Sequence, residues 1–240
     1  MYYGVALALL LVALYAVWAS FFNAAPTCSD GKQNGTELGI DCGGSCSLVC
    51  LDTAHDPTVL WSRAFQTGEN SYTAAAYIRS NNIGPGAKKV GYAFYLFDES
   101  NSLIKEVDGI VDLPPVAVIP IIAPNITAGN RTVSNVKFSF SEKPIWHKVP
   151  EKSLPTIYIS QQHIDPGGSR VSATLSNQTL TDAKNLTAVA VLFDSSGVAR
   201  AASKSFVARI PARSTQSVEF TWPTNNPNIV RVEITVLPSF

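Results

Sequence analysis

The chain has 240 residues and carries 18 basic and 18 acidic side chains, so its net charge is zero. A balanced charge gives no general attraction to nucleic acid, and we expect no nucleic-acid partner. Charged residues make up only 15% of the sequence and hydrophobic residues 46%, and part of that apolar excess lies at the very start. The length accommodates one large domain or two of roughly 100 residues.

The first part of the chain, Tyr2 to Phe22, contains no charged residue and no proline. As a helix it spans roughly 31 Å, enough for a hydrocarbon core of about 30 Å. A cleaved signal peptide is one alternative, but it usually has a basic start and a shorter apolar stretch. A buried core helix is another, although this segment has no polar face. We therefore expect residues 1–24 to be a transmembrane anchor in contact with the lipid bilayer.

All four cysteines lie close together after this segment, with the spacing Cys-x13-Cys-x3-Cys-x3-Cys. Structural zinc sites more often use Cys-x2-Cys pairs, and no histidine lies inside the cluster. A redox site is not supported either, because Cys-x-x-Cys is missing. We expect residues 25–54 to form a small module with two disulfides, zinc binding and free thiols being the alternatives. The cysteines are Cys28, Cys42, Cys46 and Cys50, and three pairings are open.

Disulfides persist in oxidising compartments. The anchor predicts a single-pass protein. Because the Cys-rich module should face an oxidising compartment, we expect the N-terminus in the cytoplasm and the C-terminal domains outside it.

The residues between the cysteines include four oxygen donors, which are Asp30, Asn34, Glu37 and Asp41. Such side chains are typical calcium ligands, and Gly35 allows a sharp turn among them. The segment from 28 to 46 resembles a recurring surface-protein motif, roughly C-x-D-G-x-x-N-x-x-E-x-G-x-D-C-G-G-x-C. This resemblance implies a small extracellular module, with calcium as its candidate cofactor. The alternative is that the same side chains cap turns in a disulfide-linked knot.

Asn-x-Ser/Thr sequons, which mark asparagines that can carry glycans in an exported protein, recur along the chain. Besides Asn34, the candidate glycosylation sites are Asn125, Asn130, Asn177 and Asn185. Asn34 cannot easily serve both as a calcium ligand and as a glycan carrier.

The rest of the chain has the period-two alternation of β-strands with one buried and one wet face. This pattern is clear in residues 136–140, 218–222 and 230–236. Two further runs, 90–97 and 186–193, are apolar on both faces and predict central strands. Turn-forming clusters separate these segments, and no helical stripe longer than two turns follows residue 50. The sequence therefore predicts an all-β fold.

An internal repeat divides this β part in two. Leu96-Phe97-Asp98 aligns with Leu192-Phe193-Asp194 at an offset of 96 residues, and the same offset places Asn81 on Asn177. Two tandem β-sandwiches of about 90 residues explain such a repeat better than one large barrel. We expect the first at residues 55–150 and the second at 151–240.

The repeated segment resembles the Phe-x-Leu-Tyr-Asp signature of the FxLYD domain. The first copy is "FYLFD", Phe94 to Asp98, and the second is "AVLFD", in which Ala190 replaces the first aromatic residue. The resemblance implies immunoglobulin-like sandwiches, related to the WHy-type late-embryogenesis-abundant fold, in prokaryotic envelope proteins without known catalysis. In this frame, Asp98 and Asp194 close hairpin turns while the leucine and the aromatic residue fill the core.

The segment from Asp112 to Pro124 combines four prolines with seven Val, Ala or Ile residues. Proline is excluded from central strands, so this segment is either an edge strand that covers the core or an exposed ribbon that docks a partner. The candidate partner-binding residues are Pro115, Val118, Pro120 and Ile121.

Motifs of catalysis do not occur: the sequence has no Gly-x-Ser-x-Gly, no P-loop and no Gly-x-Gly-x-x-Gly. None of the three histidines, His55, His147 and His163, neighbours a nucleophile pattern. We therefore expect a non-enzymatic binding or scaffolding role in the cell envelope, with an envelope protein or the cell wall as partner. A purely structural spacer and, less favoured, a cell-surface hydrolase are the alternatives.

Overall fold

The computed structural model describes residues 2–22, 27–82, 84–115, 118–150 and 154–238. It divides the chain into two compact units, Met1–Cys50 and Leu51–Phe240. All helices and strands described in the second unit are strands of antiparallel sheets, which confirms the predicted all-β class.

One helix and thirteen strands make up the described structure. They are α1 (Tyr2–Phe22), β1 (Thr58–Gln66), β2 (Ser71–Arg79), β3 (Pro85–Phe97), β4 (Leu103–Leu113), β5 (Val118–Thr127), β6 (Asn135–Phe140), β7 (Trp146–Lys148), β8 (Ile157–Ile164), β9 (Arg170–Asn177), β10 (Ala183–Asp194), β11 (Ala199–Ile210), β12 (Ser214–Thr221) and β13 (Ile229–Pro238).

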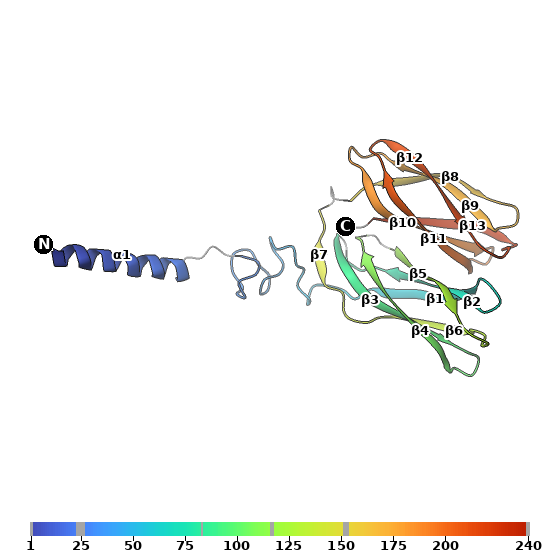
Figure 1. Ribbon diagram of the computed structural model, residues 1–240, viewed down its shortest axis with the longest axis horizontal. Helices are drawn as coiled ribbons and strands as arrows, with labels where there is room; N and C mark the ends of the chain where they lie inside the picture. The colour runs from blue at the N-terminus through green and yellow to red at the C-terminus, as the bar shows by residue number, and fades with distance from the viewer. Residues whose placement is uncertain (1, 23–26, 83, 116–117, 151–153, 239–240) are drawn as a thin grey trace. The chain divides into compact units, whose positions relative to one another are not determined.

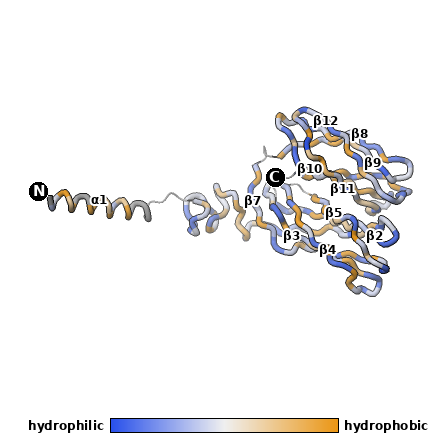
Figure 2. The backbone as a smooth tube through the Cα atoms, in the orientation of Figure 1, coloured by the Kyte–Doolittle hydropathy of each residue, from blue (hydrophilic) through white to orange (hydrophobic). Residues whose placement is uncertain are grey.

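Helix α1 contains no charged residue, and hydrophobic residues recur along its whole length (Figure 2). Its side chains are described for residues 3–7 and 10–18. Among these, no helical stretch is long and apolar enough to cross a membrane. The transmembrane anchor therefore stays a prediction from the sequence.

The thirteen strands form four antiparallel sheets in two groups, visible in Figure 1. The first β-region, residues 58–148, contains the sheets β1-β2-β5 and β4-β3-β6, with β7 beside β3. The second β-region, residues 157–238, contains the sheets β8-β9-β12 and β11-β10-β13. Strand for strand, the two orders are the same, because β1 to β6 correspond to β8 to β13. The sequence repeat is therefore a repeat of topology.

The second β-region is built around a core between its two sheets. Strands β9 and β12 contribute Leu175 and Phe220 to this core, and β10 contributes Leu186 and Leu192. These four side chains are at most 1% exposed. Burial of side chains of this size is worth roughly 1.5–3 kcal/mol each, so the facing sheets hold each other in place.

In the first β-region, aromatic rings fill the equivalent space. The rings of Phe94 and Phe138 meet edge to face, with centroids 5.1 Å apart, and Tyr92 lies against both. Gly109 makes room for Tyr92, since a Cβ there would lie 2.3 Å from its ring. The predicted central strands 90–97 and 186–193 are confirmed as parts of β3 and β10.

The strands β10 and β2 are buried on both faces. In β10, alternate residues from Leu186 to Leu192 fill the core of the second β-region, whereas Val189, Val191 and Phe193 point the other way. These three are nevertheless at most 5% exposed. In β2, Tyr77 is likewise only 6% exposed on the face opposite to the core. Strand β11 contacts β1, β2 and β5, and strand β13 contacts β5. Each of these two faces is therefore covered by a sheet of the other β-region. The sheets β1-β2-β5 and β11-β10-β13 pack against each other.

Specific contacts fasten this interface, which we call the inter-region interface. Tyr77 packs its ring edge-on against Phe193 and donates a hydrogen bond from its hydroxyl to Glu233 Oε2, at 3.2 Å. Arg231 lies 4.2 Å over the Phe193 ring, a favourable cation–π position. Trp61 stacks on Tyr77 with centroids 4.5 Å apart. Burial raises the pKa of Tyr77 to about 12, against the opposing effect of the nearby Arg231 charge.

The β part, expected as two domains meeting at residues 150 and 151, is therefore held as one compact unit.

The apolar proline segment belongs to this packing. From Val118 on it belongs to β5, an edge strand that pairs with β2 and with no other strand among the described residues, where the missing proline N–H does no harm. Pro120 and Ile121 are buried, while Pro115 and Val118 are half-buried. Of the two interpretations of the segment, the edge strand that covers the core is confirmed and the exposed ribbon is wrong. Partner binding by these four residues stays a prediction.

Register shows what the strand covers. Ile121 lies opposite Ala76, on the face of β2 that points into the core of the first β-region. Pro120 lies opposite Tyr77, on the face toward the second β-region. Lys204 of that region donates a hydrogen bond from Nζ to the Ile122 carbonyl, at 3.1 Å.

Asn177 ends β9 and is fully buried. Its amide Nδ2 donates hydrogen bonds to the carbonyls of Thr181, Ile210 and Pro211, at 2.8–3.1 Å. A nitrogen used in this way and closed off from solvent cannot carry a glycan, so the glycosylation prediction at this sequon is wrong. The other three candidates, Asn125, Asn130 and Asn185, are exposed and stay predictions.

Replacing Asn177 with Ala should lower the free energy of unfolding by about 3 kcal/mol, because the buried carbonyl of Ile210 and the part-buried carbonyls of Thr181 and Pro211 lose their donor. Urea denaturation followed by circular dichroism measures this. Asn130→Ala, at an exposed turn position without a positive φ, is the control and should stay within about 0.5 kcal/mol of wild type. Equal effects of the two substitutions would contradict the anchoring role of Asn177.

Candidate functional site

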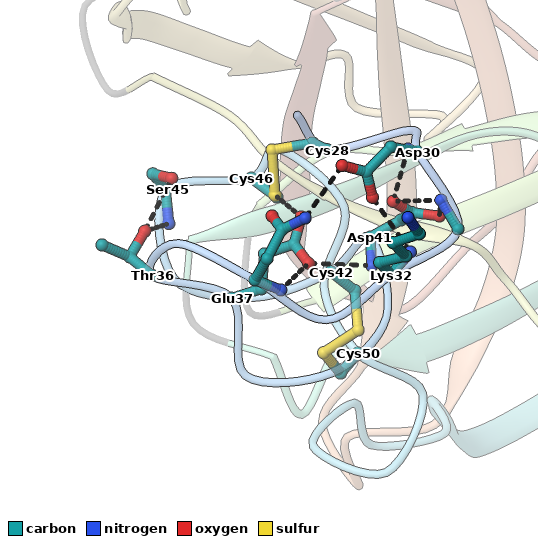
Figure 3. Close-up of a disulfide and its surroundings, with 12 residues drawn as sticks. Cys28, Asp30, Lys32, Thr36, Glu37, Asp41, Cys42, Ser45, Cys46 and Cys50 are labelled. Atoms are coloured by element: carbon teal, nitrogen blue, oxygen red, sulfur yellow. Dashed lines mark hydrogen bonds between the residues drawn. A yellow bond between two sulfur atoms is a disulfide. The ribbon is translucent and has the colours of Figure 1, made fainter. Parts of the chain in front are cut away.

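Two disulfides staple the Cys-rich segment, joining Cys28 to Cys46 and Cys42 to Cys50 (Figure 3). They confirm the predicted disulfide module and select one of the three pairings. The loops they close are 18 and 8 residues long, and closing loops of this size stabilises a fold by about 3 kcal/mol each. Glu37 lies near the Cys28 and Cys46 sulfurs, but disulfide sulfurs are not the thiolates that zinc requires.

Glycines allow the knot, residues 27–50, to close tightly. A Cβ on Gly39 would lie 2.9 Å from the Cys42 sulfur. Gly44 has a φ of +52°, and a Cβ there would lie only 1.7 Å from the Thr36 carbonyl oxygen. Gly44 is thus required for packing, because the backbone at Gly44 passes directly against the backbone at Thr36.

Gly44→Ala should prevent native disulfide pairing, since the clash involves backbone that cannot move aside. Gly31→Ala is the matched control, because Gly31 also has a positive φ, +71°, but open space around its Cα. Peptide mapping of the non-reduced proteins by mass spectrometry should find both native disulfides in Gly31→Ala and mispaired or free cysteines in Gly44→Ala. Native pairing in both would contradict the packing requirement.

The candidate calcium ligands do lie together in the knot, and each carboxylate is engaged (Figure 3). Asp41 accepts hydrogen bonds from the backbone N–H groups of Asp30 and Gly31, both at 2.9 Å. Glu37 Oε2 accepts those of Asn34 and Asp41, at 3.2 and 3.3 Å. These bonds are what the turn-capping alternative describes.

Asp30 and Asn34 bond to each other within the same network. Asn34 Nδ2 donates to Asp30 Oδ2 at 2.8 Å, and the Lys32 N–H donates to Oδ1 at 2.9 Å. The Asn34 bond, together with that backbone bond, lowers the pKa of Asp30. Calcium would have to compete with these interactions, so calcium binding by Asp30, Asn34, Glu37 and Asp41 stays a prediction while the turn-capping role is directly visible.

Asp98 and Asp194 occupy equivalent positions in the two β-regions and close equivalent hairpins. Asp194 Oδ1 accepts hydrogen bonds from the N–H groups of Ser196 and Val198, at 2.9 and 3.0 Å. Its Oδ2 contacts Arg200 Nε and Nη2, each at 2.6 Å. The turn-closing role expected for this aspartate is confirmed.

The first copy repeats the arrangement with a different cation. Asp98 Oδ1 accepts the Ser102 N–H at 2.9 Å and the Ser100 hydroxyl at 2.7 Å. Its other oxygen pairs with Arg131, which comes from the loop before β6 rather than from the hairpin itself. The bond to Arg131, followed by those to Ser100 and Ser102, holds the pKa of Asp98 far below its usual range.

Protonation of these aspartates in acid should lower the free energy of unfolding. The hydrogen bond from Val198, followed by the interaction with Arg200, lowers the pKa of Asp194 to about 2, against about 3.9 in unfolded chains. Because the folded-state value is the lower one, its contribution to stability is complete above pH 4 and is lost as the pH falls through 2.

Asp194→Asn should therefore take up about one proton fewer on unfolding at pH 3 than wild type. The pH dependence of urea unfolding between pH 2 and 5 gives this number. An unchanged slope would contradict the role of the carboxylate charge.

A groove of about 330 Å3 lies where the two β-regions meet. Its floor includes Pro120 and Ile121 of β5, and its rim carries Ile110 of β4 and Phe206 of β11. Ile110 and Phe206 are 71% and 66% exposed, although both are large and apolar. The predicted partner-binding segment thus contributes the floor of a groove, and the exposed apolar groups beside it come from other strands.

The sequence reasoning missed Ile110 and Phe206. Each lies next to another apolar residue of its strand, Val111 or Val207, so the sequence alone does not show which of the two side chains faces outward.

No family model matches the chain, and no curated protein matches it either.

Proposed function

We propose that this chain is an exported, membrane-tethered protein of the cell envelope with a non-enzymatic binding or scaffolding role. Two disulfides within residues 27–50 support export, since such bonds persist in oxidising compartments. The uncharged helix Tyr2–Phe22 supports a single-pass tether, and the disulfide-bonded knot that follows it supports an N-terminus in the cytoplasm. The Cys-rich knot then belongs to the extracytoplasmic part.

The two β-regions are proposed to be tandem immunoglobulin-like sandwiches of the FxLYD type. Support comes from the repeated order, in which the first, second and fifth strands form one sheet and the fourth, third and sixth form the other. Such a split between two facing sheets resembles the immunoglobulin arrangement. Within the signature, Leu96 and Leu192 are fully buried and Asp98 and Asp194 close hairpins.

A non-enzymatic role agrees with the way the carboxylates are used. The aspartates with a shifted pKa, Asp30, Asp98, Asp165 and Asp194, all have it lowered, and hydrogen bonds within their own turns contribute in every case. A general acid needs a raised pKa and an open approach to substrate. These side chains organise turns instead.

The single observation that carries a binding role is the groove between the β-regions with its exposed Ile110 and Phe206. Large apolar side chains exposed beside a buried apolar floor favour contact with another protein. We assign the groove to an extended apolar segment of an envelope partner. A purely structural spacer would have no use for these two side chains.

The test replaces both rim residues with serine in the full-length protein and crosslinks it in its native membrane. Ile110→Ser with Phe206→Ser should abolish the crosslinked complex seen for wild type without lowering the thermal midpoint. The control pair is Leu180→Ser with Val230→Ser, equally exposed at 75% and 63% but outside the groove, and it should keep the complex. Identical crosslinking in both double variants would favour the spacer.

A further inference from the structure

A second cavity, of about 580 Å3, opens at another part of the inter-region interface. Strand β1 and the segment leading into β6 line it from the first β-region, and the start of β11 lines it from the second. This cavity is distinct from the groove, since the two share no lining residue.

Two guanidinium groups line this cavity from different β-regions. Arg63 of β1 is exposed and makes no ion pair with any described residue. Arg200 of β11 is oriented by the Asp194 carboxylate through Nε and Nη2. No aspartate or glutamate is among the described residues that line the cavity. The charge of Arg200 is balanced by Asp194, so Arg63 supplies the positive charge of this concave place, which favours an anionic ligand.

The register of β1 explains why Arg63 lies there. Trp61, Arg63 and Phe65 pair with Tyr77, Ala75 and Thr73, so all three lie on the face of the sheet that points toward the second β-region. Trp61 is half-buried, and its ring is backed by the stacked ring of Tyr77. The indole is therefore held in place while part of it stays accessible.

The exposed groups of the lining besides the arginines are polar, and the apolar residues Ala64 and Val133 are half-buried. Gln66 and Asn135 contribute side-chain amides and are exposed, and Ser134 adds a hydroxyl. The apolar residues Phe65, Val136 and Ala199 are buried. An apolar peptide segment would require a lining richer in accessible apolar side chains. The lining instead offers the indole ring of Trp61, side-chain amides, hydroxyl groups and arginine guanidinium groups.

We propose that this cavity binds the carboxylate-bearing sugars of an acidic polysaccharide. The free guanidinium of Arg63 would take the sugar carboxylate, as such groups pair well with planar anions. Amides of Gln66 and Asn135 suit the hydroxyl groups, which both donate and accept. Trp61 supplies an apolar surface for the C–H face of a sugar ring. This site adds a ligand to the proposed envelope role and uses residues outside the groove.

Isothermal titration calorimetry of the detergent-solubilised full-length protein tests the proposal. Tetragalacturonate is the probe, neutral maltotetraose tests the need for carboxylates, and a tetraglutamate peptide tests whether any polyanion suffices. We expect tetragalacturonate to bind and the other two to bind at least about tenfold more weakly, a difference of about 1.4 kcal/mol.

Arg63→Gln should weaken tetragalacturonate binding at least tenfold and leave the thermal midpoint unchanged, because the side chain is exposed. Arg79→Gln removes an equally exposed arginine of β2 outside the cavity and should bind like wild type. Asn135→Ala should weaken both tetragalacturonate binding and any residual binding of maltotetraose.

Three results would overturn the proposal: no binding of tetragalacturonate, equal affinity of Arg63→Gln and wild type, or equal affinity for the tetraglutamate peptide. None of these results bears on the groove, so the proposed partner contact is tested separately.

Discussion

The packing of the outer face of β2 against the outer face of β10 is the interaction on which the rest of this structure depends. Each strand already buries one face in the core of its own β-region, so covering the second face joins two sheet pairs into a single unit. Tyr77 and Phe193 are the central contact, and Glu233 satisfies the buried Tyr77 hydroxyl. Both cavities with a proposed ligand lie along this interface and would be lost if the β-regions separated.

Acidic side chains have a consistent role in this chain, which is to hold turns. Asp98 and Asp194 each accept a backbone N–H bond across a hairpin and each bind an arginine. Asp41 and Glu37 do the same work in the knot, where no sheet is available to satisfy the backbone. Backbone N–H groups in turns need acceptors, and a chain with short, tight connections uses its carboxylates to supply them. In the second β-region this role also prepares a site, because Asp194 orients Arg200 at the edge of a cavity.

The sequence allowed the all-β class, the disulfide module and the central strands β3 and β10 to be predicted, because alternation and cysteine spacing are local signals. The inter-region interface was not predicted. In β10 the sequence indicates that both faces are buried, because Val189 and Val191 are apolar on the face opposite to the core. An apolar second face does not indicate which element covers it. In β2 the signal is weaker still, since Ala75 and Tyr77 are compatible with a solvent-facing strand.

The candidate sites were predicted less completely than the fold. For the proline segment the sequence left an edge strand and an exposed ribbon open, because the pattern does not distinguish an edge strand covered by a second sheet from a free ribbon. Asn177 fitted a glycosylation sequon, yet its amide closes a buried turn that only the fold reveals. Arg63 and Arg200 lie 137 positions apart in the sequence and line one cavity only because two β-regions meet there.

The distance between the two outer sheets tests the central claim most directly. Nitroxide labels on cysteines introduced at Lys105 of β4 and Gln216 of β12, two exposed positions in different β-regions, allow double electron–electron resonance on the full-length protein. The native cysteines are all in disulfides, so labelling is specific. The account predicts one narrow distance distribution that becomes broad when Phe193 is replaced by Asp. A distribution that is already broad with Phe193 in place would contradict it.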